Sequence, residues 1–472
     1  MKTLTKISFF LITTLYGFNS THIGKFLYVN SIVRQGNLLV VATDGGVFTY
    51  DLFNKALENS IITSSPVKLA ITQNALTGYF VDFLGNLYRW DISRGDKYFL
   101  ASVGNITSLG VCCDKIYTES NGRITAYTTG GIRLGIMKPS PATLWVGRLN
   151  SLKKGDDKIL FLQPYFFIDD FAGRVDLSYF YKNFSDLWVG TRGMGIYHYN
   201  FTLKLKDDSI QIGLPFKQVK SMAAIDGKIY FGGEYGIAKM KGSIWRPFLP
   251  GVQSGLDCPS ISKLAVLEKK LIVGTDCGIQ YLSPYGFRDI RPRGRLLGVF
   301  DNELIVQDGN YIATVSPDGG KLLALKFPFD VEEADSFNGE MLLLADNKLF
   351  ALTGNSLKPL RSINKFAPIY AFATSENSIY AVTESGLLKM KNGIVEKLAY
   401  PFRPYKNKHY PMMVSDSRVF IGTVNGVYIY NEKSKSVSRI WQELSNKNVL
   451  SLFYSDGRLF VGTANGLNIV KF

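Results

Sequence analysis

The sequence predicts an all-β fold of about twelve four-stranded β-propeller blades, arranged as two tandem propellers. Three observations lead to this prediction. A pattern of alternating apolar residues, then Gly-Thr, then a turn glycine, recurs through the chain. Its turns recur about every 40 residues, which is the spacing of propeller blades rather than of helical repeats. Apolar residues alternate with a period of two almost everywhere, which indicates strands.

The repeated unit is typical of a β-hairpin. Asn-Gly, Asp-Gly and Ser-Gly pairs supply the positive φ that tight turns need. A third strand often precedes the pair and a looser fourth can follow, as in residues 219–248, and four antiparallel strands make one blade. We expect the glycine before each threonine to let neighbouring blades converge. The clearest copies of the pattern are residues 187–197, 271–281, 419–429 and 459–469, and residues 40–50 keep it with alanine for the first glycine.

The spacing of the turns also predicts how the blades are divided. Between residues 122 and 193 there is room for one extra blade, with strands at 143–148 and 158–167 and a turn at 169–173. Since closed propellers have roughly 4–8 blades, a dozen blades indicates two rings, split six plus six or seven plus five. The Gly-, Pro- and Ser-rich segment near the middle places residues 21–255 in an N-terminal propeller and residues 256–472 in a C-terminal one. A single open or very large ring is the alternative.

Propellers commonly close by pairing strands from both chain ends in one blade. Residues 26–33 form a good strand before the first full hairpin, so we expect this segment to close one ring.

The first residues resemble an export signal. Lys2 and Lys6 supply positive charge, and residues 7–18 are mostly apolar. This stretch is shorter than the roughly 20 residues of a transmembrane helix. We therefore expect residues 1–20 to be a signal peptide, with no later membrane span and a mature protein in the periplasm or outside the cell. An uncleaved anchor or a buried first strand is the alternative.

The chain offers few ligands for a metal or a haem. It has four cysteines and three histidines, without a Cys-x-x-Cys motif or a Cys/His cluster, so we expect no metal and no cofactor. In an oxidising compartment Cys258 and Cys277 could pair, because they lie in one expected blade. We expect the adjacent Cys112 and Cys113 to be free buried thiols, since a bond between neighbours would be strained.

The formal net charge is +15. A basic surface attracts anionic partners such as lipid headgroups, acidic glycans or an acidic protein. Nucleic acid is not an expected partner of an exported protein. The alternative is a generally basic surface without a dedicated site, because the charge is spread along the chain.

The Gly-Thr-x-x-Gly hairpin at this spacing resembles the two-component-regulator propeller repeat, from about residue 26 to the end of the chain. The resemblance implies a propeller that belongs either to the sensor region of a kinase or to a stand-alone exported protein. No membrane span or kinase element follows the last repeat, so we expect the stand-alone form.

Two segments are candidate binding loops. Residues 288–295 hold four arginines, whose guanidinium groups bind carboxylates and phosphates in bidentate fashion. Residues 400–411 mix cations with aromatic rings, which stack on sugars or apolar groups. The alternative is that both are solvated connections between blades. The candidate ligand- or partner-binding residues are Arg288, Arg291, Arg293, Arg295, Tyr400, Arg403, Tyr405, Lys406, Lys408 and Tyr410.

No catalytic constellation is found in the sequence. It lacks a nucleophile elbow and a phosphate-binding loop. We expect Glu332 and Glu333 to lie in a polar connection between strands and to have no catalytic role.

The sequence therefore predicts a non-catalytic exported propeller that binds a protein partner or an anionic envelope glycan or lipid, as a scaffold, assembly or accessory factor. A periplasmic ligand sensor acting with a separate kinase or receptor is one alternative. A propeller hydrolase or lyase with a site at the channel mouth is another. A cluster of carboxylates or histidines at one mouth would favour the enzyme, and a broad apolar or basic loop face would favour the binding protein.

Overall fold

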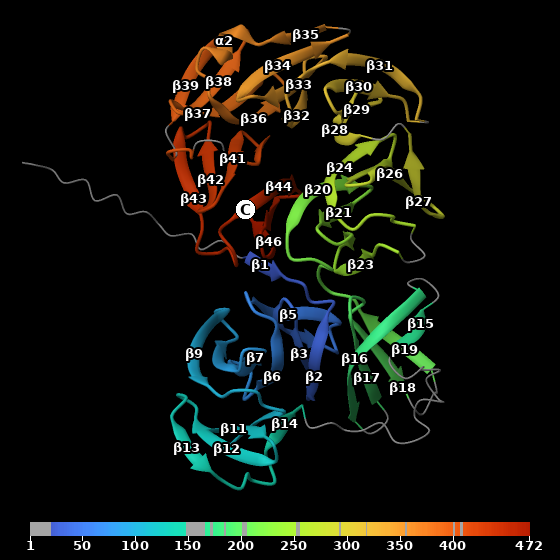
Figure 1. Cartoon of the computed structure of the whole chain (residues 1–472). Helices are drawn as coiled ribbons and strands as arrows, with labels where there is room; N and C mark the ends of the chain where they lie inside the picture. Colours follow the sequence, from blue (N-terminus) through green and yellow to red (C-terminus); the bar gives the residue numbers. More distant parts are fainter. Residues whose placement is uncertain are drawn as a thin grey trace, which may run out of the picture.

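The computed structural model describes residues 20–147, 166–169, 173–183, 186–200, 205–251, 255–291, 294–317, 319–354, 356–399, 402–405 and 409–472. In these residues, strands β1 to β46 form eleven antiparallel sheets, nine with four strands and two with five (Figure 1). One short helix, α2 (Arg361–Asn364), lies between two of the sheets. The prediction of an all-β fold made of propeller blades is confirmed.

Seven of the sheets form a closed ring, which we call the seven-sheet ring. Its strands are β20 (Val219–Ile225), β21 (Lys228–Gly233), β22 (Ile237–Lys241), β23 (Ile244–Phe248), β24 (Ile261–Leu267), β25 (Lys270–Thr275), β26 (Gly278–Ser283), β27 (Gly286–Ile290), β28 (Arg295–Phe300), β29 (Glu303–Asp308), β30 (Tyr311–Val315), β31 (Lys321–Lys326), β32 (Val331–Phe337), β33 (Glu340–Ala345), β34 (Lys348–Thr353), β35 (Ser356–Pro359), β36 (Ile369–Ser375), β37 (Ser378–Thr383), β38 (Gly386–Lys391), β39 (Ile394–Ala399), β40 (Met412–Ser415), β41 (Arg418–Thr423), β42 (Gly426–Asn431), β43 (Ser436–Ile440), β44 (Val449–Ser455), β45 (Arg458–Thr463), β46 (Gly466–Lys471) and β1 (Ser20–Ile23). The first strand of each sheet contacts the first strand of the next, from β20 through β24, β28, β32, β36 and β40 to β44, which contacts β20 again. The first strands therefore form the inner wall of the ring.

A strand from the other end of the chain completes the last sheet. β1 pairs antiparallel with β46, with Ser20 opposite Val470 and Ile23 opposite Leu467. The prediction that the two ends meet in one sheet is confirmed, but the expected residues are wrong, because Val29–Gln35 begins another sheet. Of the expected signal segment, residues 1–19 lie outside the described residues, and Ser20 belongs to β1.

The other four sheets, which we call the four-sheet group, come between β1 and β20 in the chain (Figure 1). Their strands are β2 (Val29–Gln35), β3 (Leu38–Thr43), β4 (Gly46–Asp51), β5 (Ala56–Ile62), β6 (Val67–Thr72), β7 (Thr77–Asp82), β8 (Asn86–Asp91), β9 (Asp96–Ser102), β10 (Ser108–Cys112), β11 (Lys115–Ser120), β12 (Arg123–Thr128), β13 (Arg133–Ile136), β14 (Leu144–Val146), β15 (Phe166–Asp169), β16 (Gly173–Asn183), β17 (Asp186–Thr191), β18 (Ile196–Asn200) and β19 (Leu205–Ile210). Again the first strands contact one another, β16 with β2, β2 with β6 and β6 with β10.

The expected extra blade is divided between two sheets. β14 is a fifth strand beside β10, and β15 is a fifth strand beside β16. Residues 148–165, which were expected to supply another of its strands, lie outside the described residues. The boundary expected after residue 255 falls between β23 and β24, which are both parts of the seven-sheet ring.

One hydrophobic core joins the ring to the four-sheet group. Val29, Val41 and Phe48 from the four-sheet group pack in the same cluster as Phe231 and Phe460 from the ring. A hydrogen bond reinforces the junction, since the side-chain amide of Asn465, between β45 and β46, donates to the carbonyl of Thr63, just after β5, across 3.0 Å. The two parts therefore share buried surface instead of being joined by a linker alone.

The Gly-Thr pattern has two separate structural roles. A Cβ on Gly422 would lie 2.5 Å from Cγ1 of Val449 in the next sheet, so glycine allows the close approach of the two sheets. The hydroxyl of Thr423 donates to the carbonyl of Gly426 across 2.9 Å and accepts from the amide of Asn425 across 3.0 Å, which closes the turn. The expected packing role of the glycine is confirmed, and the threonine adds a turn cap.

Two disulfides are present. Cys258 and Cys277 are bonded with their Cα atoms 6.0 Å apart, which answers the question that the sequence left open. Cys112 and Cys113 are also bonded to each other, so the expectation of free buried thiols is wrong. Cys113 is exposed with a φ of 53°, because it lies in the tight turn between β10 and β11 rather than in the core.

Candidate functional site

The two candidate binding loops lie on one face of the seven-sheet ring. Neighbouring strands in each sheet run in opposite directions. Each first strand therefore starts on the same face of the ring as the turn that joins the second strand to the third. The connection from the fourth strand to the next sheet lies on this face too. Residues 288–295 lead from β27 into β28, and residues 400–411 join β39 to β40. We call this side of the ring the connection face.

The candidate residues have different surroundings. Arg288, Arg291 and Arg403 are exposed, and Tyr405 is 61% exposed. Tyr410 is only 2% exposed, and its hydroxyl accepts a hydrogen bond from the amide of Tyr405 across 2.7 Å. Tyr410 therefore holds Tyr405 in place rather than facing a ligand. Arg293, Tyr400, Lys406 and Lys408 lie outside the described residues.

Arg295 joins two neighbouring sheets. Its guanidinium donates to Oε1 of Gln307 across 2.7 Å and to the carbonyl of Val331, which begins β32. Gln307 in turn accepts from the amide of Val331 across 3.1 Å. Although Arg295 is exposed, its guanidinium is already hydrogen-bonded within the ring, so it positions the start of β32.

The two candidate loops meet at Glu332. His409, at the end of the second loop, shares a hydrogen bond between its Nε2 and Oε2 of Glu332. Burial raises the pKa of Glu332, where nearby Asp346 acts in the same direction and Arg295 opposes it. Burial also lowers the pKa of His409, so both shifts favour the neutral forms of the pair. The expectation that Glu332 and Glu333 lie in a polar connection is wrong, because both belong to β32.

Glu333 occupies the inner wall of the ring. At the equivalent place in another sheet, Ser221 accepts from the amide of Leu264 in the next first strand across 2.8 Å. Glu333 accepts from the amide of Phe372 in the same way, while its Oε2 is buried without a partner in the described part of the chain. Burial raises the pKa of Glu333 to about 8, against the opposing charge of Lys263. A neutral carboxyl therefore lies in the wall at neutral pH.

Large aromatic side chains are exposed around the connection face. They come from the turns between second and third strands and from the connections between sheets. Because they are scattered along the chain, no continuous sequence motif reveals them. They are Tyr235, Tyr311, Phe329, Phe366, Tyr405 and Trp441. Cations accompany them, since Lys447 lies 4.8 Å and Arg439 5.1 Å from the centre of the Trp441 ring.

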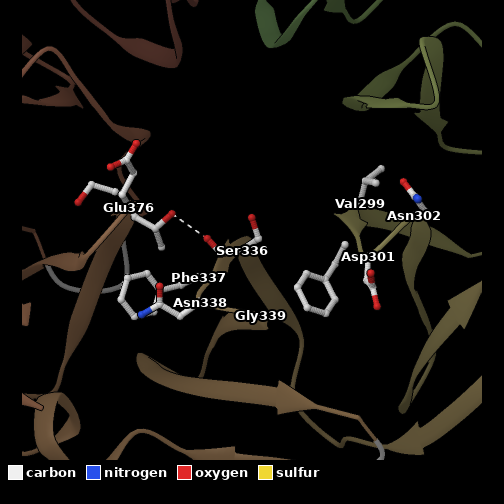
Figure 2. Close-up of a pocket in the computed structure, with 11 residues that line it drawn as sticks. Val299, Asp301, Asn302, Ser336, Phe337, Asn338, Gly339 and Glu376 are labelled. Carbon is white, nitrogen blue, oxygen red and sulfur yellow. Dashed lines mark hydrogen bonds between the residues drawn. The ribbon is translucent and has the colours of Figure 1, made fainter. Parts of the chain in front are cut away.

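A pocket of about 670 Å³ opens on the opposite face of the ring (Figure 2). It lies among the turns that follow β28, β32 and β36, with Asp301 on one side and Glu376 on the other. The hydroxyl of Thr374 donates to the carbonyl of Ser336 across 3.0 Å, and its amide donates to Oδ2 of Asp335 across 3.1 Å, which ties two of these turns together. The charged side chains that line this pocket are acidic. Sequence reasoning missed the pocket because its members are ordinary turn residues.

Neither a metal site nor a membrane-spanning helix is found in the part of the chain that the structure describes. No group of three His, Cys, Asp or Glu side chains in it is placed to hold a metal ion. No helix among the same residues is both long enough and apolar enough to cross a membrane.

No family model and no curated protein matches this chain. It is similar to the extracellular domain of BT4673 from B. thetaiotaomicron, with 12% identity and a TM-score of 0.48 over 93% of this chain and 75% of that one. PorZ, a surface component of the type-IX secretion system of Porphyromonas gingivalis, has 13% identity and a TM-score of 0.43 over 95% and 74% of the two chains. A streptogramin B lyase has 12% identity and a TM-score of 0.44, over 55% of this chain and 95% of the lyase. Similarities of this size do not assign the chain to a family.

Proposed function

We propose that this chain is an exported, non-catalytic propeller that binds an acidic partner protein on the connection face of the seven-sheet ring. The observation that carries the proposal is the set of exposed aromatic side chains on that face, together with Arg291 and Arg403. Aromatic residues and arginine are enriched at protein interfaces and dominate their binding energy.

Contacts made by the described residues of the second candidate loop support this proposal. The Tyr410 hydroxyl holds the backbone of Tyr405, and the Phe402 ring stacks on Tyr428 with the ring centres 5.0 Å apart. His409 fixes the end of the same loop on Glu332. A loop that is ordered before binding loses less entropy when the partner arrives. The net charge of +15 would speed the approach of an acidic partner.

Affinity capture from the cell envelope tests the proposal. The tagged wild-type protein is compared with an Arg403→Glu/Tyr405→Ala double variant and with Tyr285→Ala. Tyr285 is 87% exposed but lies in the turn between β26 and β27, on the opposite face, so it is a matched aromatic control. We expect a stoichiometric acidic protein with the wild type and with Tyr285→Ala, and its loss with the double variant. Equal capture by all three proteins would contradict the proposal.

Export is part of the same proposal. It is supported by the signal-like composition of residues 1–20 and by the Cys258–Cys277 disulfide, which an oxidising compartment permits. Because β1 begins at Ser20, cleavage that preserves the ring must occur before that residue. N-terminal sequencing of protein from the envelope fraction should find a mature start at or before Ser20, and a start beyond Ile23 would contradict this expectation.

A hydrolase or lyase with a channel-mouth site is a second candidate, favoured by the Glu332–His409 hydrogen bond and by the raised pKa of Glu333. A carboxyl that is neutral near pH 7 can act as a general acid. The test is turnover of a panel of glycosides, esters and lactones by the wild type and by Glu332→Gln. Turnover lost in the variant would favour this candidate over a binding protein.

A further inference from the structure

A different pocket lies on the four-sheet group, between its second and third sheets. It has a volume of about 560 Å³ and opens beside β11, β12 and β13 and the segment that follows β9. It belongs to neither candidate loop and lies outside the seven-sheet ring, so it is independent of the function proposed above.

Strand register gathers polar side chains on one wall of this pocket. Ser120 pairs with Arg123 and Thr118 pairs with Thr125 between β11 and β12. Arg133 on β13 lies opposite Tyr127 on β12. Directly opposed residues project from the same face of a sheet, and all six of these residues line the pocket. One sheet face therefore presents two guanidinium groups among several hydroxyls.

The charge of the pocket is of one sign. Its charged lining residues are Arg123 and Arg133, and no acidic residue lines it. In the part of the chain that the structure describes, neither guanidinium group forms an ion pair or a hydrogen bond. Two guanidinium groups in one pocket, with no acidic residue in its lining, attract an anion.

We propose that this pocket binds the phosphate group of a phosphorylated ligand. Arginine forks bind phosphate oxygens in bidentate fashion, and the hydroxyls of Ser102 and Thr125 supply further donors, whereas the hydroxyl of Ser120 donates to the carbonyl of Asn105. The apolar neighbours of Arg133 point to the source of the phosphate, because Ile132 and Ile136 are each 70% exposed and Leu134 is 45% exposed. Cations beside exposed apolar side chains suit the headgroup region of an anionic phospholipid.

The binding test uses three probes on the full-length protein. Glycerol 3-phosphate and acetate are titrated by calorimetry, and vesicles of phosphatidylglycerol in phosphatidylcholine are used for sedimentation. The test variant is Arg123→Gln/Arg133→Gln. The control is Arg89→Gln/Arg94→Gln, which removes the same charge from β8 and the turn after it without touching the pocket lining. Thermal unfolding checks that all variants are folded.

We expect the pocket variant to bind glycerol 3-phosphate and the vesicles at least about tenfold more weakly than the wild type, because hydrogen bonds to charged groups are lost. The control should change these two affinities less than about threefold. Ile132→Ser/Ile136→Ser should weaken vesicle binding alone if the phosphate belongs to a lipid. If this last variant binds the vesicles as well as the wild type does, the apolar side chains do not contribute, which would assign the pocket to a soluble phosphate. Three outcomes would overturn the proposal. Acetate could bind more strongly than glycerol 3-phosphate, the pocket variant and the control could lose the same amount of binding, or no phosphate probe could bind.

Discussion

The seven-sheet ring and the four-sheet group are made from the same hairpin unit, yet they present opposite charges in their pockets. The ring has an acidic pocket at the turns that carry Asp301 and Glu376, whereas the four-sheet group has a basic pocket with Arg123 and Arg133. These side chains lie at turns or on strands away from the inner wall, where the packing of the repeat does not restrict them. The difference teaches that the repeat determines the fold, while the residues outside its core determine what each part can bind.

The two parts also differ in how they are completed. The ring needs β1 from the N-terminal end of the chain, whose Ile23 is 2% exposed in the shared core. A chain that begins at Gly24 should therefore lose at least about 3 kcal/mol of stability relative to a chain that begins at Ser20, from the lost burial of Ile23 and the lost strand pairing. Chemical denaturation of the two chains measures the difference. Equal midpoints would show that β1 does not close the ring.

Close approach between sheets is a feature that both parts share, and it can be tested at one glycine. Gly422→Ala should cost about 1–3 kcal/mol, because the new Cβ would meet Val449 and Pro411. Gly298→Ala is the control, since the nearest atom to its Cβ is Cε of Met341 at 3.7 Å. Thermal unfolding compares the two variants. A similar loss from both substitutions would mean that glycine is not needed for sheets to converge.

Glu333 differs from the serines that follow the corresponding bulge in other first strands, Ser221 in the ring and Ser31 in the four-sheet group. The folded-state pKa of Glu333 is raised from 4.5 to about 8, so the folded protein holds a proton that the unfolded chain releases. Stability should therefore fall as the pH rises between these two values. The stability of Glu333→Gln, which cannot ionise, should not show this fall, so it should rise relative to the wild type by at least about 1 kcal/mol from the lower to the upper end of this window. Urea unfolding at several pH values measures this gain, and parallel curves for the two proteins would contradict it.

The smallest expected effect concerns the loop between β39 and β40. Tyr410→Phe removes the acceptor of the Tyr405 amide and should cost about 0.5–1.5 kcal/mol. Hydrogen exchange of the Tyr405 amide should become faster in this variant. Unchanged exchange would mean that Tyr410 does not order the loop.

Much of the fold could be predicted from local patterns. Alternation and turn glycines reveal the hairpins, and their spacing reveals the blades. The insertion of the four-sheet group between β1 and β20 could not be predicted, because pairing of Ile23 with Leu467 joins residues at opposite ends of the chain and leaves no local signal. The Gly-, Pro- and Ser-rich segment near residue 255 misplaced the boundary, because a connection between two sheets of one ring can have the same composition as a connection between two rings.

The candidate site was only partly predictable. An arginine in a loop looks the same in sequence whether it is exposed like Arg403 or hydrogen-bonded to a neighbouring sheet like Arg295, and a loop tyrosine looks the same whether it is exposed like Tyr405 or buried like Tyr410. Trp441 was missed because the connection face is assembled from separate connections, each with few aromatic residues. Arg123 and Arg133 were missed because only the β12–β13 pairing brings their strands together.

Site-specific photo-crosslinking tests the central claim most directly. A photoreactive phenylalanine analogue replaces Tyr405 on the connection face or Tyr285 on the opposite face, and the protein is irradiated in intact cells. We predict one dominant adduct with an acidic protein from position 405 and none from position 285, because both side chains are exposed but only the first lies among the aromatic and arginine residues. An adduct from position 285 alone, or none from either position, would contradict a partner-binding connection face.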